Sequence, residues 1–167
     1  MMKTYKGRYS VKIPMKYKGD HTSVIYRSSW ELYVMKWCDR TPDVVEWSSE
    51  EVVIPYICGT DNRAHRYFMD FYVKYRSGEI CIIEVKPATQ TKPPTGKRKT
   101  KQYLNEVTTY VKNASKWKAA EDYAATRGWK FVIWTEHELM RMEILPKPLK
   151  PLKKMPAFKK KKKVKKK

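Results

Sequence analysis

The sequence has no apolar run long enough to cross a membrane and few of the features that mark a secreted chain. None of its hydrophobic stretches approaches the ~18 residues that a spanning helix needs. Residues 1–9 contain no apolar stretch of the signal-peptide kind. The three cysteines, Cys38, Cys58 and Cys81, form no CxxC pair, which argues against a zinc ribbon and against a disulfide framework. We therefore expect no membrane association through a spanning helix and no secreted disulfide scaffold.

Acidic residues are scarce. The 167 residues include 37 Lys+Arg against 17 Asp+Glu, which gives a formal net charge of +20. The last segment, 146–167, holds 12 lysines and no acid, yet residues 1–145 alone keep a balance of +8. A chain with this charge is expected to bind a polyanion, with nucleic acid first and an anionic membrane surface second.

Composition divides the chain into three parts. Residues 1–25 are basic and rich in Tyr and Gly, which is typical of an N-terminal arm rather than of a core element. Residues 26–145 form the body. The chain has 22 aromatic residues, which is too many for a disordered body. Residues 146–167 are a low-complexity Lys/Pro tail that we expect to be disordered on its own and electrostatic in purpose.

The residue pattern of the body predicts the element order α-β-β-β-α-β, which is an α+β or mixed α/β layout. Ser28 and Glu31 fit a capping box, so a helix begins there and ends at Thr41-Pro42-Asp43. Strands are expected over 44–47, 52–57, 66–74 and 80–86, the last two forming a hairpin, and over 129–134. Thr100 caps a long helix to about residue 126, and a capping box at 135–138 opens a short one. The long helix is expected to bury Leu104, Val107, Val111, Ala114, Trp117, Ala120 and Ala124.

The hairpin carries the residues with chemical interest. If its turn is Arg76-Ser77-Gly78, residue 70 lies directly across from residue 84, and cross-strand partners project to the same side. This register puts Asp70, Glu84 and Lys86 on one face of the sheet, whereas a shift of one residue would separate them. The alternative is a cross-strand salt cluster on a solvated face.

Two carboxylates at this distance repel each other unless a positive charge lies between them. Oxygen ligands suit Mg²⁺ or Mn²⁺, and such an ion can bridge a phosphate and polarise a water. Lys86 can then orient the water or stabilise negative charge on the phosphorane. The pattern therefore predicts metal-assisted phosphodiester hydrolysis.

Basic residues follow this motif directly. Residues 87–99 contain three prolines and a glycine, so we expect an exposed loop without regular structure. Lys112 and Lys116 lie one turn apart on the long helix, where they face either DNA or solvent. The expected phosphate contacts are Lys92, Lys97, Arg98, Lys99, Lys101, Lys112 and Lys116. His65, by contrast, fits a hydrogen-bonded turn histidine.

Together these residues resemble a known family. Asp70, the Glu84-Val85-Lys86 triplet and the preceding Glu31 helix resemble the PD-(D/E)xK nuclease core. The runs YRSSWE, RYFMDF and EVKP are similar to those of the head-completion nucleases of large contractile-tailed bacteriophages, which are similar in turn to the endonuclease subunit of certain heteromeric transposases. The resemblance covers roughly residues 5–140 and departs at Met69, where the family has a proline. That proline is structural, so the chemistry is kept.

The resemblance implies a restriction-endonuclease-like core with a mixed central sheet. It implies an active site of Glu31, Asp70, Glu84 and Lys86, in which Asp70 and Glu84 bind Mg²⁺, Glu31 is an outer ligand and Lys86 is the catalytic lysine. Mn²⁺ is expected to substitute for Mg²⁺, and no small-molecule cofactor is expected. As a capping-box glutamate, Glu31 needs no catalytic role, so both interpretations of it stay open.

The resemblance also implies a role. The chain would be a metal-dependent deoxyribonuclease, with endo- or exonuclease preference open, that trims packaged double-stranded DNA so that phage heads join tails. Its partners would include phage portal or neck proteins, and its location the host cytoplasm during assembly and the head-neck region of the virion. Two alternatives stand: a structural DNA-binding head-closure protein with a vestigial nuclease site, and an endonuclease subunit of a mobile element.

Overall fold

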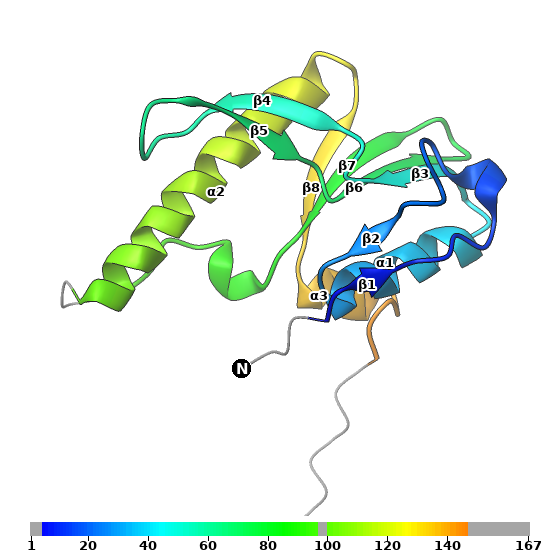
Figure 1. The fold of residues 1–167 in the computed structure, drawn as a ribbon, viewed down its shortest axis with the longest axis horizontal. Coiled ribbons are helices and arrows are strands. Elements are labelled where there is room, and N and C mark those ends of the chain that lie inside the picture. The colour runs from blue at the N-terminus through cyan, green and yellow to red at the C-terminus, as the bar shows by residue number, and fades with distance from the viewer. Residues whose placement is uncertain (1–4, 97–99, 147–167) are drawn as a thin grey trace, which may run out of the picture.

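The computed structural model describes residues 5–96 and 100–146. Its centre is a four-stranded sheet of strand order β3-β6-β7-β8, in which β7 and β8 are parallel and the other neighbours antiparallel (Figure 1). With the helices α1 and α2, the sheet's elements follow the order α1-β3-β6-β7-α2-β8, so the predicted layout and the mixed sheet are confirmed. The bounds are α1 Ser29–Arg40, β3 Val44–Ser49, β6 Phe71–Tyr75, β7 Ile80–Val85, α2 Lys101–Ala125 and β8 Lys130–Trp134.

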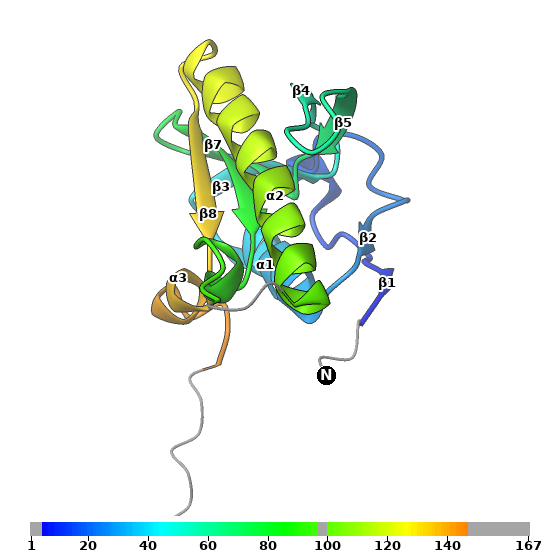
Figure 2. The ribbon, with the colours of Figure 1, turned by 90° about the vertical axis from the view of Figure 1, so that its left-hand side faces the viewer.

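Each face of the sheet has its own cover (Figure 2). Cys81 and Ile83 of β7 pack in one core with Val34 of α1 and Leu139 of α3 (Glu136–Arg141). Ile82, on the other side of β7, packs in a second core with α2 and with a separate hairpin of β4 (Val53–Ile57) and β5 (Ala64–Phe68). Alternation along β7 therefore aims Glu84, two residues after Ile82, at the α2 side.

Short-range capping fixes where the helices begin. Ser28 Oγ accepts a 3.2 Å hydrogen bond from Glu31 N at the start of α1. Thr100 Oγ1 accepts from Tyr103 N at 3.1 Å at the start of α2. Thr135 and Glu138 form a complete capping box on α3. All three helix starts were predicted from these side chains.

The strand expected over 66–74 is two strands, and that prediction is wrong. The chain leaves the β4–β5 hairpin at Phe68 and enters the central sheet at Phe71, because β5 pairs with β4 while β6 pairs with both β3 and β7. Met69 joins the two sheets: its N–H donates to Val52 O at 2.9 Å and its carbonyl accepts from Glu50 N at 3.1 Å. The predicted register of the following hairpin is confirmed, since Phe71 pairs with Ile83 and residue 70 therefore precedes β6 opposite residue 84.

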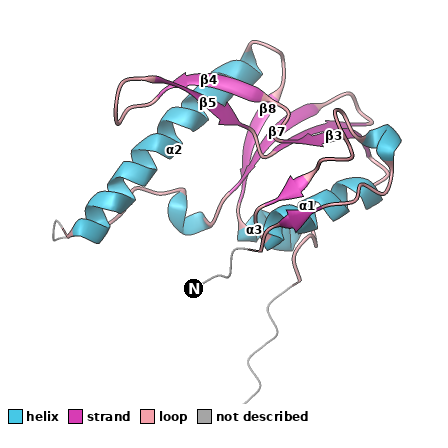
Figure 3. Ribbon diagram, in the orientation of Figure 1, coloured by secondary structure: helices cyan, strands magenta, loops and turns pink. Residues whose placement is uncertain are grey.

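The buried side of α2 differs from the prediction in its first turns. Leu104, expected to be buried, is 51% exposed. The first half of α2 projects beyond the edge of the sheet (Figure 3), and the described α2 residues that join the second core all lie in its second half, from Ala119 to Ala124. The buried residues of the helix are Asn113, Trp117, Ala120 and Ala124.

Part of the N-terminal segment belongs to the core, which the sequence did not predict. Residues 7–26 contain the two-stranded pair β1 (Gly7–Arg8) and β2 (Ile25–Tyr26) and the 3-10 turn η1 (Pro14–Lys16). Tyr9, Tyr17 and Val24 are buried in the core that includes α1. The Tyr9 hydroxyl donates to Asp39 Oδ2 at 2.6 Å, which ties this segment to the end of α1.

The division of the chain at residues 25 and 145 stays a prediction. Most of the expected Lys/Pro tail, 147–167, lies outside the described residues, as do Lys97, Arg98 and Lys99 of the basic loop. Within the described ranges, no helix combines the length and the apolar character needed to cross a bilayer.

Candidate active site

Asp70 occupies the junction between the two sheets. It precedes β6, and its Oδ2 accepts a 2.8 Å hydrogen bond from Val85 N at the end of β7. The carboxylate thus takes the place of a backbone acceptor at the point where the β6–β7 pairing stops. This bond holds Asp70 beside the Glu84-Val85-Lys86 triplet, as the register predicted.

Glu84 is buried, with 3% of its surface exposed. Tyr67 Oη donates to its Oε2 at 2.6 Å, and Lys86 Nζ lies 2.9 Å from its Oε1. Both carboxylate oxygens therefore have a partner, which a buried charge requires. Asp70, Glu84 and Lys86, separated by up to 16 positions in the sequence, come together at one end of β7.

The electrostatics of the three groups are linked. Burial, followed by the charge of Glu84, raises the pKa of Asp70 well above its usual value, against the Val85 N–H and the Lys86 ammonium. Burial lowers the pKa of Lys86, but the neighbouring carboxylates, Glu84 first, outweigh it and the net shift is upward. The Lys86 ammonium is therefore charged at neutral pH, where it partly compensates the buried Glu84 and the half-buried Asp70.

Glu31 lies in the first turn of α1, where it serves as a cap. Its Oε1 accepts from Ser28 Oγ at 2.9 Å and its Oε2 from Arg27 N at 2.7 Å. Its negative charge raises the pKa of Asp70 and of Lys86, although it is the smallest of the causes that shift each of them. Glu31 thus borders the cluster from α1 without a direct hydrogen bond to Asp70 or Glu84 among the described contacts.

A further carboxylate, Glu50, borders the same region and was not singled out from the sequence. Arg27 Nη1 lies 2.6 Å from Glu50 Oε1. Burial raises the pKa of Glu50, the Arg27 charge opposes that shift, and Glu31 adds to it. Glu50 has a positive φ of 58°, which is uncommon outside glycine and is held by its N–H bond to Met69.

The lysines expected to contact phosphate lie in different places. Lys92 is exposed beyond the 3-10 turn η2 (Ala88–Gln90), and Lys101 is exposed at the first position of α2. Lys112 is exposed on α2. Lys116 is half-buried, and its Nζ lies 5.2 Å from the centre of the Tyr67 ring, so it is linked to Glu84 through that tyrosine.

The oxygen donors of Asp70 and Glu84 fit a hard divalent cation such as Mg²⁺ or Mn²⁺. A second set of metal-ligating groups lies elsewhere: Cys58, Asp61 and His65 at the tip of the β4–β5 hairpin have ligand atoms within 4.8 Å of one another. A thiolate favours softer ions than Mg²⁺, so this cluster does not fit the predicted cofactor. His65 Nε2 is 2.9 Å from Asp61 Oδ2, the turn hydrogen bond expected for this histidine.

Two comparisons with known proteins decide the family. The family described as TnsA-like endonuclease N terminal matches residues 41–136. The chain belongs to the TnsA-like endonuclease family. It is also 42% identical over 141 residues, 81% of this chain and 93% of the other, to a protein of Enterobacteria phage T4 named Head completion nuclease.

Membership of the TnsA-like endonuclease family agrees with the restriction-endonuclease-like fold expected from the sequence. The matched stretch contains Asp70, Glu84 and Lys86, whereas Glu31 lies before it. Tyr67 was missed because a single strand over 66–74 would have pointed it away from Asp70. The signal that could have found it is position 69, where the family that the sequence resembles has a proline, a residue that interrupts a central strand.

Proposed function

We propose that this TnsA-like endonuclease is a metal-dependent deoxyribonuclease of phage head completion, which trims packaged DNA so that heads can join tails. Support for the nuclease comes from the family and from the relative whose name is Head completion nuclease. One observation supports the active site above all: Asp70 bonds Val85 N at 2.8 Å while Glu84 pairs with Lys86 at 2.9 Å, so the three side chains converge at one strand end.

In this proposal Asp70 and Glu84 hold Mg²⁺, with Glu31 as an outer contact. The bound ion supplies Lewis-acid activation of the phosphate and of a water. Tyr67 orients Glu84 through its hydroxyl, and Lys86 neutralises negative charge that builds on the phosphate oxygens. Lys92, Lys101, Lys112 and Lys116, together with Lys97, Arg98 and Lys99, contact the backbone of double-stranded DNA.

The proposed setting is the host cytoplasm during assembly and the head-neck region of the virion, with portal or neck proteins as partners. The endonuclease subunit of a mobile element is the second candidate, since the family match covers that activity. It would cut only with a partner subunit present. A protein that cuts DNA alone favours the phage role.

The test is cleavage of linear and circular DNA by the purified chain with Mg²⁺, with Mn²⁺ and with EDTA. Cutting is expected with either ion and not in EDTA. Asp70→Ala and Lys86→Ala are expected to abolish cutting while DNA binding stays within about threefold, because the removed groups are few among many phosphate contacts. Asp122→Ala and Lys118→Ala are matched controls, since these two residues pair with each other on the exposed side of α2. Full-rate cutting in EDTA, or by Asp70→Ala, would contradict the proposal.

A further inference from the structure

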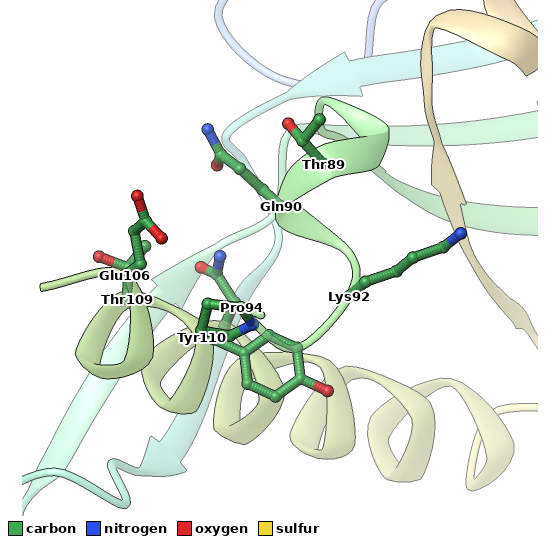
Figure 4. A pocket seen from close by; sticks show the side chains of 8 residues that line it. Thr89, Gln90, Lys92, Pro94, Glu106, Thr109 and Tyr110 are labelled. Atoms are coloured by element: carbon green, nitrogen blue, oxygen red, sulfur yellow. The ribbon is translucent and has the colours of Figure 1, made fainter. Parts of the chain in front are cut away.

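A pocket lies between η2 and α2 (Figure 4), and η2 begins two residues after Lys86 of the proposed active site. Its volume is about 360 Å³, within the range of about 300–1,000 Å³ found for ligand pockets. Gln90 lines it from η2, while Glu106, Tyr110 and Asn113 line it from α2. Gln90 follows Lys86 by four residues, so the Cα atoms of the two are at most about 14 Å apart.

Asn113 is the residue that points to a ligand. It is only 6% exposed, and its Nδ2 has no hydrogen-bond partner among the described residues. A buried amide without a partner costs about 1–3 kcal/mol. Asn113 continues the buried row of Trp117 and Ala120, where an apolar side chain would pack without that cost. A ligand in the pocket that accepts this hydrogen bond would remove the penalty.

The lining indicates what kind of ligand fits. The amides of Gln90 and Asn113 both donate and accept hydrogen bonds, the exposed Glu106 carboxylate accepts, and Tyr110 supplies an aromatic ring. A site for a bare phosphate would not include a carboxylate. A nucleobase has both donors and acceptors on its edge and a π-face that stacks on aromatic side chains. Lys92, the one cation among the described residues of the lining, suits the phosphate next to that base.

We propose that this pocket receives one unpaired base of the DNA strand that lies across Asp70 and Glu84. The inference rests on the proposed nuclease function and adds a substrate preference to it. Stacked bases are about 3.4 Å apart along a strand, so the pocket lies within a few nucleotides of the cut. In a duplex the base edge is occupied by its complement, so the chain discriminates in favour of DNA with an unpaired nucleotide near the cleavage position.

Binding in EDTA tests the pocket without cleavage. Fluorescence anisotropy of end-labelled DNA compares a fully paired duplex with the same duplex carrying one unpaired base near its end. Wild type is expected to bind the second duplex more tightly. Gln90→Ala and Asn113→Ala are each expected to weaken that binding about three- to tenfold, the effect of one or two lost hydrogen bonds. Asn105→Ala, an exposed amide of α2 outside the pocket, is the matched control and is expected to bind like wild type.

Gln90 is exposed, so Gln90→Ala stays informative even if the circular dichroism melt shows that Asn113→Ala fails to fold. Equal affinity of wild type for the two duplexes overturns the inference, and so does wild-type affinity in Gln90→Ala. The proposed nuclease function can fail independently of the pocket. If the protein prefers the unpaired base in EDTA but leaves DNA intact in Mg²⁺, the inference about the pocket stands and the nuclease function is wrong.

Discussion

The hydroxyl of Tyr67 donates a 2.6 Å hydrogen bond to Glu84 Oε2, across two sheets that share no strand. Tyr67 belongs to the β4–β5 hairpin and Glu84 to the central sheet. Burial, followed by the charge of Glu84, raises the pKa of Tyr67, so the phenol keeps its proton and remains a donor at neutral pH. The hairpin therefore determines the orientation of a carboxylate that we propose holds the metal.

Removing this hydroxyl is expected to weaken Mg²⁺ binding more than it lowers the stability of the fold. In Tyr67→Phe, Glu84 Oε2 loses its donor, and loss of such an outer partner typically costs 10–100-fold in metal affinity or activity. The measurement is the Mg²⁺ concentration that gives half-maximal cleavage, which should rise about 10–100-fold. Tyr123→Phe is the control, since Tyr123 packs on Trp129 within the second core. Identical Mg²⁺ titrations for the two variants would contradict a positioning role for Tyr67.

Asp70→Asn is expected to stabilise the protein in EDTA, increasingly as the pH rises. Folding raises the pKa of Asp70. The carboxyl therefore contributes fully to the free energy of unfolding when the pH is below its ordinary pKa of about 3.9, and this contribution is lost as the pH rises through the pKa of the folded state. The asparagine amide does not ionise in this pH range, and its Oδ1 can still accept from Val85 N, so it avoids that loss. A gain of 1 kcal/mol appears as about 2–4 °C in Tm for a chain of this length.

Thermal unfolding of both proteins in EDTA between about pH 4 and pH 8 tests this prediction. The difference in Tm should be small at the acidic end and grow toward pH 8, and Mg²⁺ should stabilise wild type alone. A constant difference across the range would mean that the Asp70 carboxyl is not the titrating group.

Lys86→Met should destabilise the metal-free protein strongly. The substitution keeps the apolar stem but leaves the buried Glu84 Oε1 without its cation, and breaking a buried ion pair in this way costs about 3–5 kcal/mol. Urea unfolding in EDTA measures the loss. Mg²⁺ is expected to restore part of the stability without restoring cleavage. Full cleavage by a folded Lys86→Met would remove the lysine from the proposed mechanism.

Glu31 can be tested as cap and as ligand separately. Glu31→Ala removes the two acceptor oxygens that the Glu31 carboxylate offers to Arg27 N and Ser28 Oγ and should cost about 0.5–2 kcal/mol. Glu31→Gln keeps one acceptor and removes the charge, so its stability should lie closer to wild type. A loss of cleavage in Glu31→Gln of tenfold or more would support a metal role, whereas wild-type cleavage would leave Glu31 as a cap alone.

Contacts between α2 and the phosphate backbone of DNA should appear in the salt dependence of DNA binding. Each phosphate contact contributes about 0.9 to the slope of log affinity against log salt concentration. Lys112→Ala is expected to lower that slope by about this amount. Lys118→Ala, which removes a lysine already paired with Asp122, should leave it unchanged. Equal slopes for wild type and Lys112→Ala would place Lys112 outside the DNA interface.

The parts of the fold that the sequence predicted are those determined by near neighbours. Ser28, Thr100 and Thr135 each begin a helix through a hydrogen bond within three residues. The turn at residues 76–78 determines the β6–β7 register, which brings residue 70 opposite residue 84. Asp70, Glu84 and Lys86 could therefore be grouped without any knowledge of the tertiary fold.

The parts that were missed depend on packing between distant elements. A run of apolar and aromatic residues over 66–74 reads as one strand, and only the competing pairings of β4 and β3 show that it divides. That division brings Tyr67 back to Glu84. Asn113 fits the helical pattern as an ordinary polar position, and its significance depends on η2 lying across α2. Leu104 was expected in the core because periodicity does not say where the sheet ends.

Met69 stands where the family that the sequence resembles has a proline, and its backbone N–H donates to Val52 O at 2.9 Å. A proline has no such hydrogen, so this hydrogen bond to Val52 could not form. With methionine, hydrogen bonding to the β4–β5 hairpin continues up to the residue that precedes Asp70. A displacement of the hairpin would therefore reach the aspartate through a single residue.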